Sequence, residues 1–283
     1  LPFYTRLEDK LQTPLDYKLR VLRRFTSVEE QNNWFQAADK PQLQPFLSLN
    51  ILENHNPLLD APFGFGEVLH TGRVDTKVLL QTYSAYLSQK GQLLEDTFDH
   101  SLLEVGEGQI RYQGVTARNL VFASGFGLKA NPYFNYLPLN GTKGELLTIR
   151  AADLNEENVI KSSVFIIPLG NHLYRVGATY KWKDKTNTPT QESRTELLEK
   201  LDTFLKADYE VVAHVAGIRP TVADRRPLVG RHPEHANIYV LNGFGSRGVL
   251  IAPYAAGQLW DYIENRGSLH PEMDINRFSQ KDN

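Results

Sequence analysis

Apolar positions recur with helical spacing in three parts of the chain. Asp75, a residue type that caps helix N-termini, precedes an apolar-periodic stretch that ends at Gly91, which predicts a helix. A second helix of about 16 residues is predicted from Gln191, because one apolar stripe runs along it. A third is predicted from Gly248 to about Asn265. The stripe of the second helix consists of Leu197, Leu198, Leu201, Phe204 and Leu205.

Short apolar runs bounded by turn residues predict strands between these helices. The chain before residue 64 has a helical and charged pattern instead, with residues 43–52 as a loop or short strand. Residues 168–171 are expected to form a tight turn, and the polar residues 266–283 a frayed tail. The mixture predicts an α/β protein. The expected strands are 92–98, 102–105, 109–112, 119–123, 145–150, 159–167, 172–178, 210–218 and 237–241.

Composition removes several classes of function. With 283 residues, the chain is long enough for one large domain or two interleaved ones. Its 31 Lys+Arg and 33 Asp+Glu leave a net charge of -2, which disfavours a broad nucleic-acid surface. The absence of Cys excludes disulfides, thiolate metal sites and cysteine nucleophiles. No apolar run approaches about 20 residues and no signal-peptide pattern is present, so we expect a cytoplasmic protein without a membrane span.

A glycine motif follows the last predicted strand. Residues 243–248 read Gly-Phe-Gly-Ser-Arg-Gly and match G-x-G-x-x-G between a strand and a helix. A dinucleotide fingerprint also needs a second strand with an acidic residue about 20 positions later, and the polar end of the chain offers none. Glycines at a helix N-terminus still let backbone amides approach a planar or anionic ligand. A ligand-binding turn and a plain strand-to-helix turn both remain open.

Other chemistries find less support. His232 and His235 are close in sequence, but no further ligands stand at workable spacing, so no metal site is predicted. Ser246 is not in a G-x-S-x-G elbow, and residues 140–144 lack the spacing of a phosphate-binding loop. Asp224-Arg225-Arg226 is interpreted as a charged turn, with contact to a phosphate-bearing substrate as the alternative.

Seven motifs, in order over residues 72–260, resemble the D-amino-acid oxidase / glycine oxidase family of FAD-dependent amine oxidoreductases. The wording of residues 243–248 also resembles the oxidase half of the bacterial tRNA-wobble-uridine modification enzyme, a member of the same family. The motifs are Gly72-Arg73-Val74-Asp75, residues 119–125, residues 141–147, residues 165–168 with 176–180, residues 216–220, residues 227–233 and residues 243–253.

The resemblance implies an FAD-binding Rossmann-like domain interleaved with an antiparallel-sheet substrate domain. Residues 1–70 and 131–215 would form the substrate domain, and residues 71–130 and 216–283 the discontinuous FAD-binding domain. The family opens with a strand–GxGxxG–helix block that holds the ADP half of FAD, whereas no Gly occurs before Gly64. We therefore expect an N-terminally incomplete FAD domain. A missing upstream piece, a partner that supplies it, or loss of FAD would each account for this.

The resemblance also implies roles for individual residues. Arg219 would pair with the substrate carboxylate, while Phe165 and Tyr180 would line the substrate pocket or simply pack in the sheet. Arg247 stands one residue after Ser246, which occupies the place of a substrate-binding arginine in some glycine oxidases. Lys143 and Glu145 lie near the flavin in the family's pattern, and no catalytic base is named. The expected cofactor-binding residues are Ala123, Ser124, Gly125, Gly144, Gly217, Gly243, Gly245, Ser246, Arg247, Gly248 and Val249.

The implied activity is oxidation of a D-amino acid or glycine-like amine to an imine, by hydride transfer to non-covalently bound FAD. The expected partner is this small substrate, not nucleic acid, with a partner chain or homo-oligomer left open. One alternative is a flavin-free or partner-completed subunit with no activity alone. Another is an oxidase acting on a carboxymethylamino group of a modified tRNA uridine.

Overall fold

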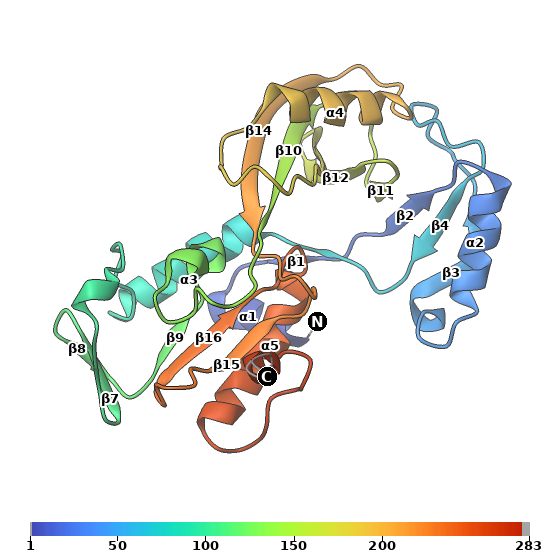
Figure 1. The fold of residues 1–283 in the computed structure, drawn as a ribbon. Helices are drawn as coiled ribbons and strands as arrows, with labels where there is room; N and C mark the ends of the chain where they lie inside the picture. Colours follow the sequence, from blue (N-terminus) through green and yellow to red (C-terminus); the bar gives the residue numbers. More distant parts are fainter. Residues whose placement is uncertain (1, 279–283) are drawn as a thin grey trace. The chain divides into compact units, whose positions relative to one another are not determined.

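The computed structural model describes residues 2–278 and divides into two units through which the chain passes repeatedly (Figure 1). Unit 1 comprises Leu1–Leu93, Gly144–Tyr180 and Asn187–Gly217. Unit 2 comprises Leu94–Lys143, Lys181–Thr186 and Ile218–Asn283. Residues 71–93, expected with the FAD-binding ranges, therefore belong to unit 1, and residues 131–143 belong to unit 2. The functional assignment of the two units stays a prediction.

Unit 1 is built on an eight-stranded sheet with strand order β14-β10-β13-β12-β11-β2-β4-β3. Strand β11 pairs with β2 in parallel, from Val159↔Val21 to Lys161↔Arg23. The pairs β10–β13, β11–β12, β12–β13, β2–β4 and β3–β4 are antiparallel. The strands are β2 (Val21–Arg24), β3 (Leu47–Leu52), β4 (Phe65–Val68), β10 (Thr142–Arg150), β11 (Val159–Lys161), β12 (Phe165–Gly170), β13 (Leu173–Gly177) and β14 (Glu210–Arg219).

Helix α4 (Gln191–Asp202) packs on this sheet and closes the main core of unit 1 (Figure 1). Leu197 and Leu201 of the predicted stripe are fully buried against sheet residues such as Leu147 and Val176. The remaining elements are α1 (Pro2–Leu11), α2 (Val28–Ala38), α3 (Thr76–Gln89), a short 3-10 turn η1 (Gln44–Phe46), and the paired strands β1 (Asp16–Tyr17) and β5 (Arg73–Val74).

Helices α3 and α4 begin at residues whose side chains cap the helix N-terminus. The Asp75 side chain accepts a hydrogen bond from the backbone N–H of Val78 at 3.1 Å, which confirms the predicted start of α3. The Thr190 hydroxyl does the same for Ser193 N–H at the start of α4, at 3.3 Å. Both caps satisfy backbone donors that the first helical turn leaves unpaired.

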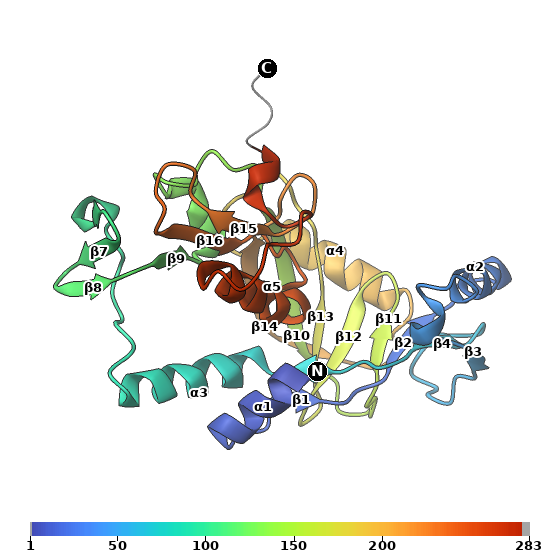
Figure 2. The same ribbon diagram turned by 90° about the horizontal axis from the view of Figure 1, so that it is seen from below.

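Unit 2 contains a three-stranded sheet of order β15-β16-β9, in which β16 and β9 are parallel and β15 and β16 antiparallel. Helix α5 (Gly248–Ile263) packs on it through Ala255 and Leu259. Figure 2 shows the helix beside β15 and β16. The remaining elements are β6 (Glu104–Gly106), β7 (Gln109–Tyr112), β8 (Val115–Ala117), β9 (Leu120–Phe122), β15 (Leu228–Arg231), β16 (Ile238–Asn242), and the 3-10 turns η2 (His100–Leu102), η3 (Gly125–Ala130) and η4 (Ile275–Phe278). Among residues 2–278 no helix is both long and apolar enough to cross a membrane.

Several sequence-based boundaries were wrong. Arg23 and Arg24, placed in a helical region, lie in strand β2. Residues 159–167 form two strands, because Ser162 N–H donates to Val164 O at 2.8 Å and reverses the chain. Residues 92–98 form no strand, and strands β8 and β15 were not predicted.

The expected frayed tail is also wrong for its described part. Leu269, Met273 and Ile275 are buried in the cores of unit 2. Val229 N–H donates to Met273 O at 2.9 Å, so the chain after α5 returns to the sheet beside β15. Residues 279–283 of the predicted tail lie outside the described residues.

Candidate functional site

Two of the predicted cofactor-binding turns meet at one edge of the unit 2 sheet. Because β9 and β16 are parallel, residues 123–125 and Gly243 follow the C-terminal ends of these strands on the same side of the sheet. The buried Asn242 side chain joins the turns: its Nδ2 donates to Gly125 O at 2.9 Å, and its Oδ1 accepts from Gly243 N–H at 2.8 Å. Sequence reasoning missed Asn242. Its position, a buried amide directly before the glycine motif, was the available signal.

The glycines of these turns are required for different reasons. Gly125, Gly243 and Gly245 have φ angles of +58°, +76° and +56°, which favour glycine. A Cβ on Gly243 would lie 2.7 Å from Val222 Cγ2, so packing inside the unit already accounts for that glycine. A Cβ on Gly125 would meet nothing within 4 Å, and one on Gly245 would meet only Thr221 Oγ1 at 3.8 Å. At Gly125 and Gly245 the positive φ angle favours glycine, while the space beside the Cα atom is open.

The N-terminus of α5 is formed by the same motif. Its cap residue Arg247 makes no side-chain capping hydrogen bond within the described part of the chain. Gly248 opens the helix, and a Cβ there would come no closer than 3.6 Å to Phe244 Cβ. Ser246 and Val249 are exposed beside it. Backbone amides at a helix N-terminus, uncrowded by side chains, fit the electron-accepting edge of a flavin ring.

Arg219 is held next to the glycine motif by its neighbours in unit 2. It ends β14 and is half-buried. The carbonyl of the next residue, Pro220, accepts a hydrogen bond from Gly245 N–H at 3.1 Å. The hydroxyl of Thr221 is 2.8 Å from that of Thr142, at the start of β10. Arg219, the predicted carboxylate-binding residue, therefore directly precedes a residue whose backbone is hydrogen-bonded to the predicted flavin-binding motif.

Arg247 has a different environment. Its guanidinium donates to Arg225 O at 2.8 Å and so lies along the turn of residues 224–226. In that turn Asp224 pairs with Arg277 at 2.9 Å, and Arg226 pairs with Glu272 at 2.8 Å. The structure thus places Arg247 with a charged turn, as an exposed residue.

The remaining predicted residues belong to unit 1. Phe165 in β12 lies opposite Gly177 of β13 and is half-buried, with Lys161 Nζ 5.7 Å from the centre of its ring. Burial, and the positive charge of Arg23, lower the pKa of Lys161. Gly217 is exposed, and a Cβ there would meet nothing within 4 Å, so packing does not require a glycine.

Gly144 and Tyr180 come together across two antiparallel segments. Lys143 and Lys181 form a backbone bridge, and this register sets Gly144 opposite Tyr180. Gly144 is buried, whereas Tyr180 is 46% exposed. On the near side of this pair, Glu145 N–H donates to the Thr179 hydroxyl at 2.9 Å.

Two buried charges flank Gly144 and have separate partners. Lys143 Nζ is 2.5 Å from Asp184 Oδ2, and its hydrogen bond holds the pKa of the Asp184 carboxyl at about 2. The Glu145 carboxylate accepts from Thr190 N–H at 2.8 Å and from its hydroxyl at 2.9 Å. His214 Nε2 lies 2.9 Å from the same carboxylate. Glu145 therefore supports the start of α4.

His232, Glu234 and His235 form a cluster whose potential ligand atoms lie within 4.8 Å of one another. His232 Nδ1 accepts from Glu234 N–H at 3.1 Å and from His235 N–H at 3.2 Å. Burial and the neighbouring His235 lower the pKa of His232, which favours its neutral ring. In that ring an accepting Nδ1 puts the proton on Nε2 and leaves no lone pair for a metal. This geometry is that of a turn cap.

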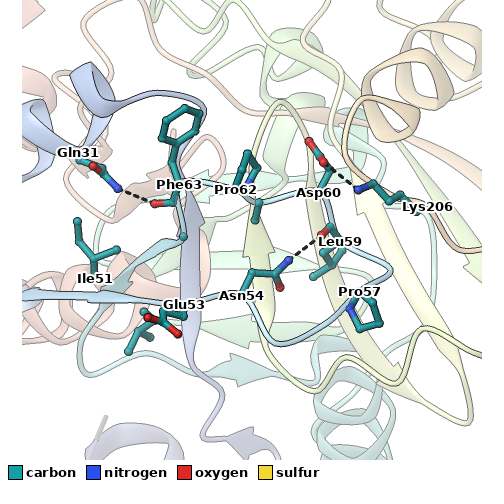
Figure 3. A pocket seen from close by; sticks show the side chains of 13 residues that line it. Gln31, Ile51, Glu53, Asn54, Pro57, Leu59, Asp60, Pro62, Phe63 and Lys206 are labelled. Atoms are coloured by element: carbon teal, nitrogen blue, oxygen red, sulfur yellow. Dashed lines mark hydrogen bonds and ion pairs between the residues drawn. The ribbon is translucent and has the colours of Figure 1, made fainter.

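A cavity of about 670 Å³ lies elsewhere in unit 1 (Figure 3). Several of its polar groups have partners within the lining: Gln31 Nε2 donates to Phe63 O at 2.7 Å, Asn54 Nδ2 donates to Leu59 O at 2.7 Å, and Lys206 Nζ is 2.9 Å from Asp60 Oδ1. None of the residues predicted from the sequence lines this cavity.

Residues 1–261 match the family model described as "FAD dependent oxidoreductase". The chain belongs to this family. Among its relatives, the glycine oxidase of Bacillus subtilis (strain 168) is 27% identical over 242 residues, which cover 80% of this chain and 65% of that protein. The tRNA 5-methylaminomethyl-2-thiouridine biosynthesis bifunctional protein MnmC of Aromatoleum aromaticum is 28% identical over 50% of this chain and 26% of its own length. The chain thus spans less than two thirds of either relative.

Solved structures confirm the predicted fold of this family member. The glycine oxidase of Geobacillus kaustophilus superposes with a TM-score of 0.76 at 21% sequence identity, covering 100% of this chain and 81% of that one. The mixed α/β architecture of an FAD-dependent oxidoreductase is therefore shown.

Proposed function

We propose that this FAD-dependent oxidoreductase oxidises a small amino acid or an N-substituted glycine to the corresponding imine. The supporting observation is the contact from Gly245 N–H to Pro220 O, which holds Arg219 one residue from the glycine motif. FAD, when bound, supplies the acceptor for the hydride that leaves the substrate carbon beside the amine. The amine nitrogen releases a proton to solvent, and water hydrolyses the imine to a carbonyl compound and an amine or ammonia.

The residues of the chain supply binding and orientation in this proposal. The Arg219 guanidinium donates two parallel hydrogen bonds to the substrate carboxylate. Residues 123–125 and 243–249 hold the flavin against backbone amides, and the N-terminus of α5 stabilises negative charge that develops on the bound ring. The pocket-lining roles expected for Phe165 and Tyr180, which belong to unit 1, stay predictions. Positioning then provides most of the rate, because no side chain is assigned as a base.

One observation favours a second candidate, oxidation of a carboxymethylamino group on a modified tRNA uridine. Half of the chain aligns with the protein MnmC, whose name refers to tRNA modification. A carboxymethylamino group is itself an N-substituted glycine, so Arg219 and the glycine motif would serve both reactions. A cytoplasmic location is part of both proposals. The alternative to both enzyme proposals is a subunit that has no activity until a partner chain completes it.

The first test is retention of FAD by the purified chain. After incubation with FAD and gel filtration, we expect visible bands near about 380 and 450 nm, characteristic of the oxidised cofactor. Anaerobic addition of glycine, sarcosine or D-alanine should bleach them. Intact mass of the native species shows whether a second chain is present. A chain that retains no FAD contradicts the enzyme proposal and leaves the partner-completed subunit.

Gly248→Ala tests whether the flavin approaches the start of α5. The fold has room for the new methyl group, whose nearest neighbour would be 3.6 Å away, and alanine favours a helix. We expect unchanged thermal stability together with at least about tenfold weaker FAD binding, equivalent to about 1.4 kcal/mol. Gly257→Ala, in the same helix and with nothing within 4 Å, is the control. Equal FAD affinity in both variants would contradict the assignment.

Arg219→Met tests the carboxylate contact. Loss of a charge-assisted pair costs about 1.5–3 kcal/mol, so kcat/KM should fall by roughly 10- to 150-fold, with FAD binding retained. Arg226→Met, an exposed arginine in the neighbouring turn, should change kcat/KM less than about twofold for small substrates. Equal effects of the two substitutions would remove Arg219 from the site.

A further inference from the structure

The turn of residues 224–226, which lies within unit 2, holds more positive than negative charge. Asp224 pairs with Arg277 at 2.9 Å, and Arg226 pairs with Glu272 at 2.8 Å. Each of these two carboxylates therefore balances one guanidinium group. The middle residue of the turn, Arg225, is a further exposed arginine that belongs to neither pair.

Arg225 and Arg247 carry positive charges that no carboxylate balances. Both are exposed, and neither forms an ion pair with another residue of the described range 2–278. Arg247 Nη2 donates to Arg225 O at 2.8 Å, so this guanidinium lies against the backbone from which the Arg225 side chain extends. The two charges therefore act on the same small part of the unit 2 surface.

The backbone of this turn is held by its own contacts. Arg225 N–H donates to Val222 O at 3.0 Å, and Arg226 N–H donates to Asp224 Oδ1 at 2.9 Å. Arg225 has a φ angle of +59°, a left-handed conformation that residues other than glycine seldom adopt. The side chain of Arg225 thus extends from a preorganised backbone, which reduces the entropy lost when an anion binds.

A phosphate group fits these two arginines better than a carboxylate does. A guanidinium group is always charged and binds carboxylate or phosphate oxygens through parallel hydrogen bonds. The two oxygens of a carboxylate lie in one plane and suit one guanidinium, whereas the tetrahedral oxygens of phosphate can bind two. Arg247 uses one donor on Arg225 O and keeps others for a ligand. Since Arg247 belongs to the glycine motif, such a ligand would lie beside that motif.

We propose that Arg225 and Arg247 bind a phosphate group of the substrate. The proposal rests on the second candidate function and deepens it, because every uridine of an RNA strand carries a phosphodiester and a free amino acid carries none. A phosphorylated small molecule offers the same chemistry, and the test separates it from RNA. The net charge of -2 is compatible with this site, because a single phosphate needs only local positive charge.

Fluorescence anisotropy of a labelled RNA stem-loop with uridine in its loop tests the site on the full chain, without FAD. Arg225→Gly removes the guanidinium, keeps the carbonyl that Arg247 contacts and suits the positive φ, so the fold should be retained. Arg225→Gly and Arg247→Gln should each weaken binding at least about fivefold, because each removes a charge-assisted contact. The slope of log Kd against log salt concentration should fall by about 0.7 in each variant.

Arg266→Gln is the matched control, since Arg266 is 61% exposed in the same unit and follows the C-terminal end of α5. Its RNA affinity should stay within about twofold of the wild type, as expected for an exposed charge outside the site. Competition separates the two sources of phosphate. Uridine 5′-monophosphate displaces the probe from a site for a phosphorylated small molecule, whereas only unlabelled RNA displaces it from a site for a strand.

Three results would overturn the proposal. They are a wild type that binds neither probe, variants at residues 225 and 247 that bind like Arg266→Gln, and displacement by uridine as effective as by its monophosphate. The proposed function has its own readout in the bleaching of bound FAD by glycine or sarcosine. If the variants lose RNA binding but the FAD-loaded wild type oxidises no amine, the phosphate site stands and the proposed function fails.

Discussion

His232 stands in a sequence pattern typical of metal ligands, but in the structure its side chain caps a turn. Its Nδ1 accepts two backbone N–H groups from residues 234 and 235, a pattern that Asn or Asp often provides in turns. The His232 side chain is buried, and both hydrogen bonds are partly shielded from solvent. The spacing His-x-x-His could not show which nitrogen would be engaged, because this depends on the local turn.

His232→Ala should lower the free energy of unfolding by about 1–3 kcal/mol, because it removes a buried ring and leaves two part-buried backbone donors without their acceptor. His232→Asn, whose side-chain oxygen can accept one of these hydrogen bonds, should recover part of the loss. Chemical denaturation measures both. The pKa of His232 is lowered in the folded protein, so the stability of the wild type should fall as pH drops through the ordinary histidine pKa of about 6.5. His232→Asn should not show this decrease, and an identical pH profile in the two proteins would contradict the assignment.

At the scale of elements, the sequence predicted the helices whose starts depend on neighbouring residues, but it did not predict features that depend on residues far away in the chain. The starts of α3 and α4 depend on Asp75 and Thr190, which act within three residues, and the sequence pattern located both helices. Strand β2 depends on partners around residues 66 and 160, so its charged sequence was mistaken for part of a helical region. The glycine turns and Arg219 were predicted as site residues from short motifs. Asn242 and the Lys143–Asp184 pair depend on contacts more than 40 residues away and were not.

The segment of residues 181–186 carries a pH prediction of its own. The pKa of Asp184 falls from 3.8 to about 2 on folding, mainly through the hydrogen bond from Lys143. A lowered carboxyl pKa means that the stabilising contribution is complete above pH 3.8 and is lost as pH falls toward 2. The difference in Tm between the wild type and Asp184→Asn should therefore stay constant from about pH 7 to 5 and shrink below about pH 4. A difference that vanishes already near pH 6 would contradict this pairing.

At the scale of the whole molecule, the chain after α5 completes a core instead of fraying. Its polar composition suggested a tail, but three spaced apolar residues, Leu269, Met273 and Ile275, are buried. Their spacing matches neither a helix nor a strand, so periodicity could not reveal them. A Cβ on Gly230 would lie 2.7 Å from Ile275 Cγ1, which shows how closely this segment packs on β15.

Ile275→Ala should therefore lower the free energy of unfolding by about 2–5 kcal/mol, the range for truncating a buried aliphatic side chain. Glu272→Ala, which removes an exposed ion pair with Arg226, should cost less than about 1 kcal/mol. Urea denaturation followed by circular dichroism gives both values. Similar small losses in the two variants would mean that residues 269–278 contribute little to the fold.

The parallel pairing of β2 with β11 has a consequence for synthesis of the chain. Val21 pairs with Val159, so the β2–β4–β3 sheet, which is complete at Val68, is synthesised about 90 residues before its partner strand begins. At about 5–20 residues per second, that interval is roughly 5–18 s. During it, the β2–β4–β3 sheet has the edge that β11 will occupy open to solvent and to other nascent chains. We therefore expect the nascent chain to depend on chaperones during translation. This dependence should fall in a circularly permuted chain in which residues 21–68 are synthesised after residue 161.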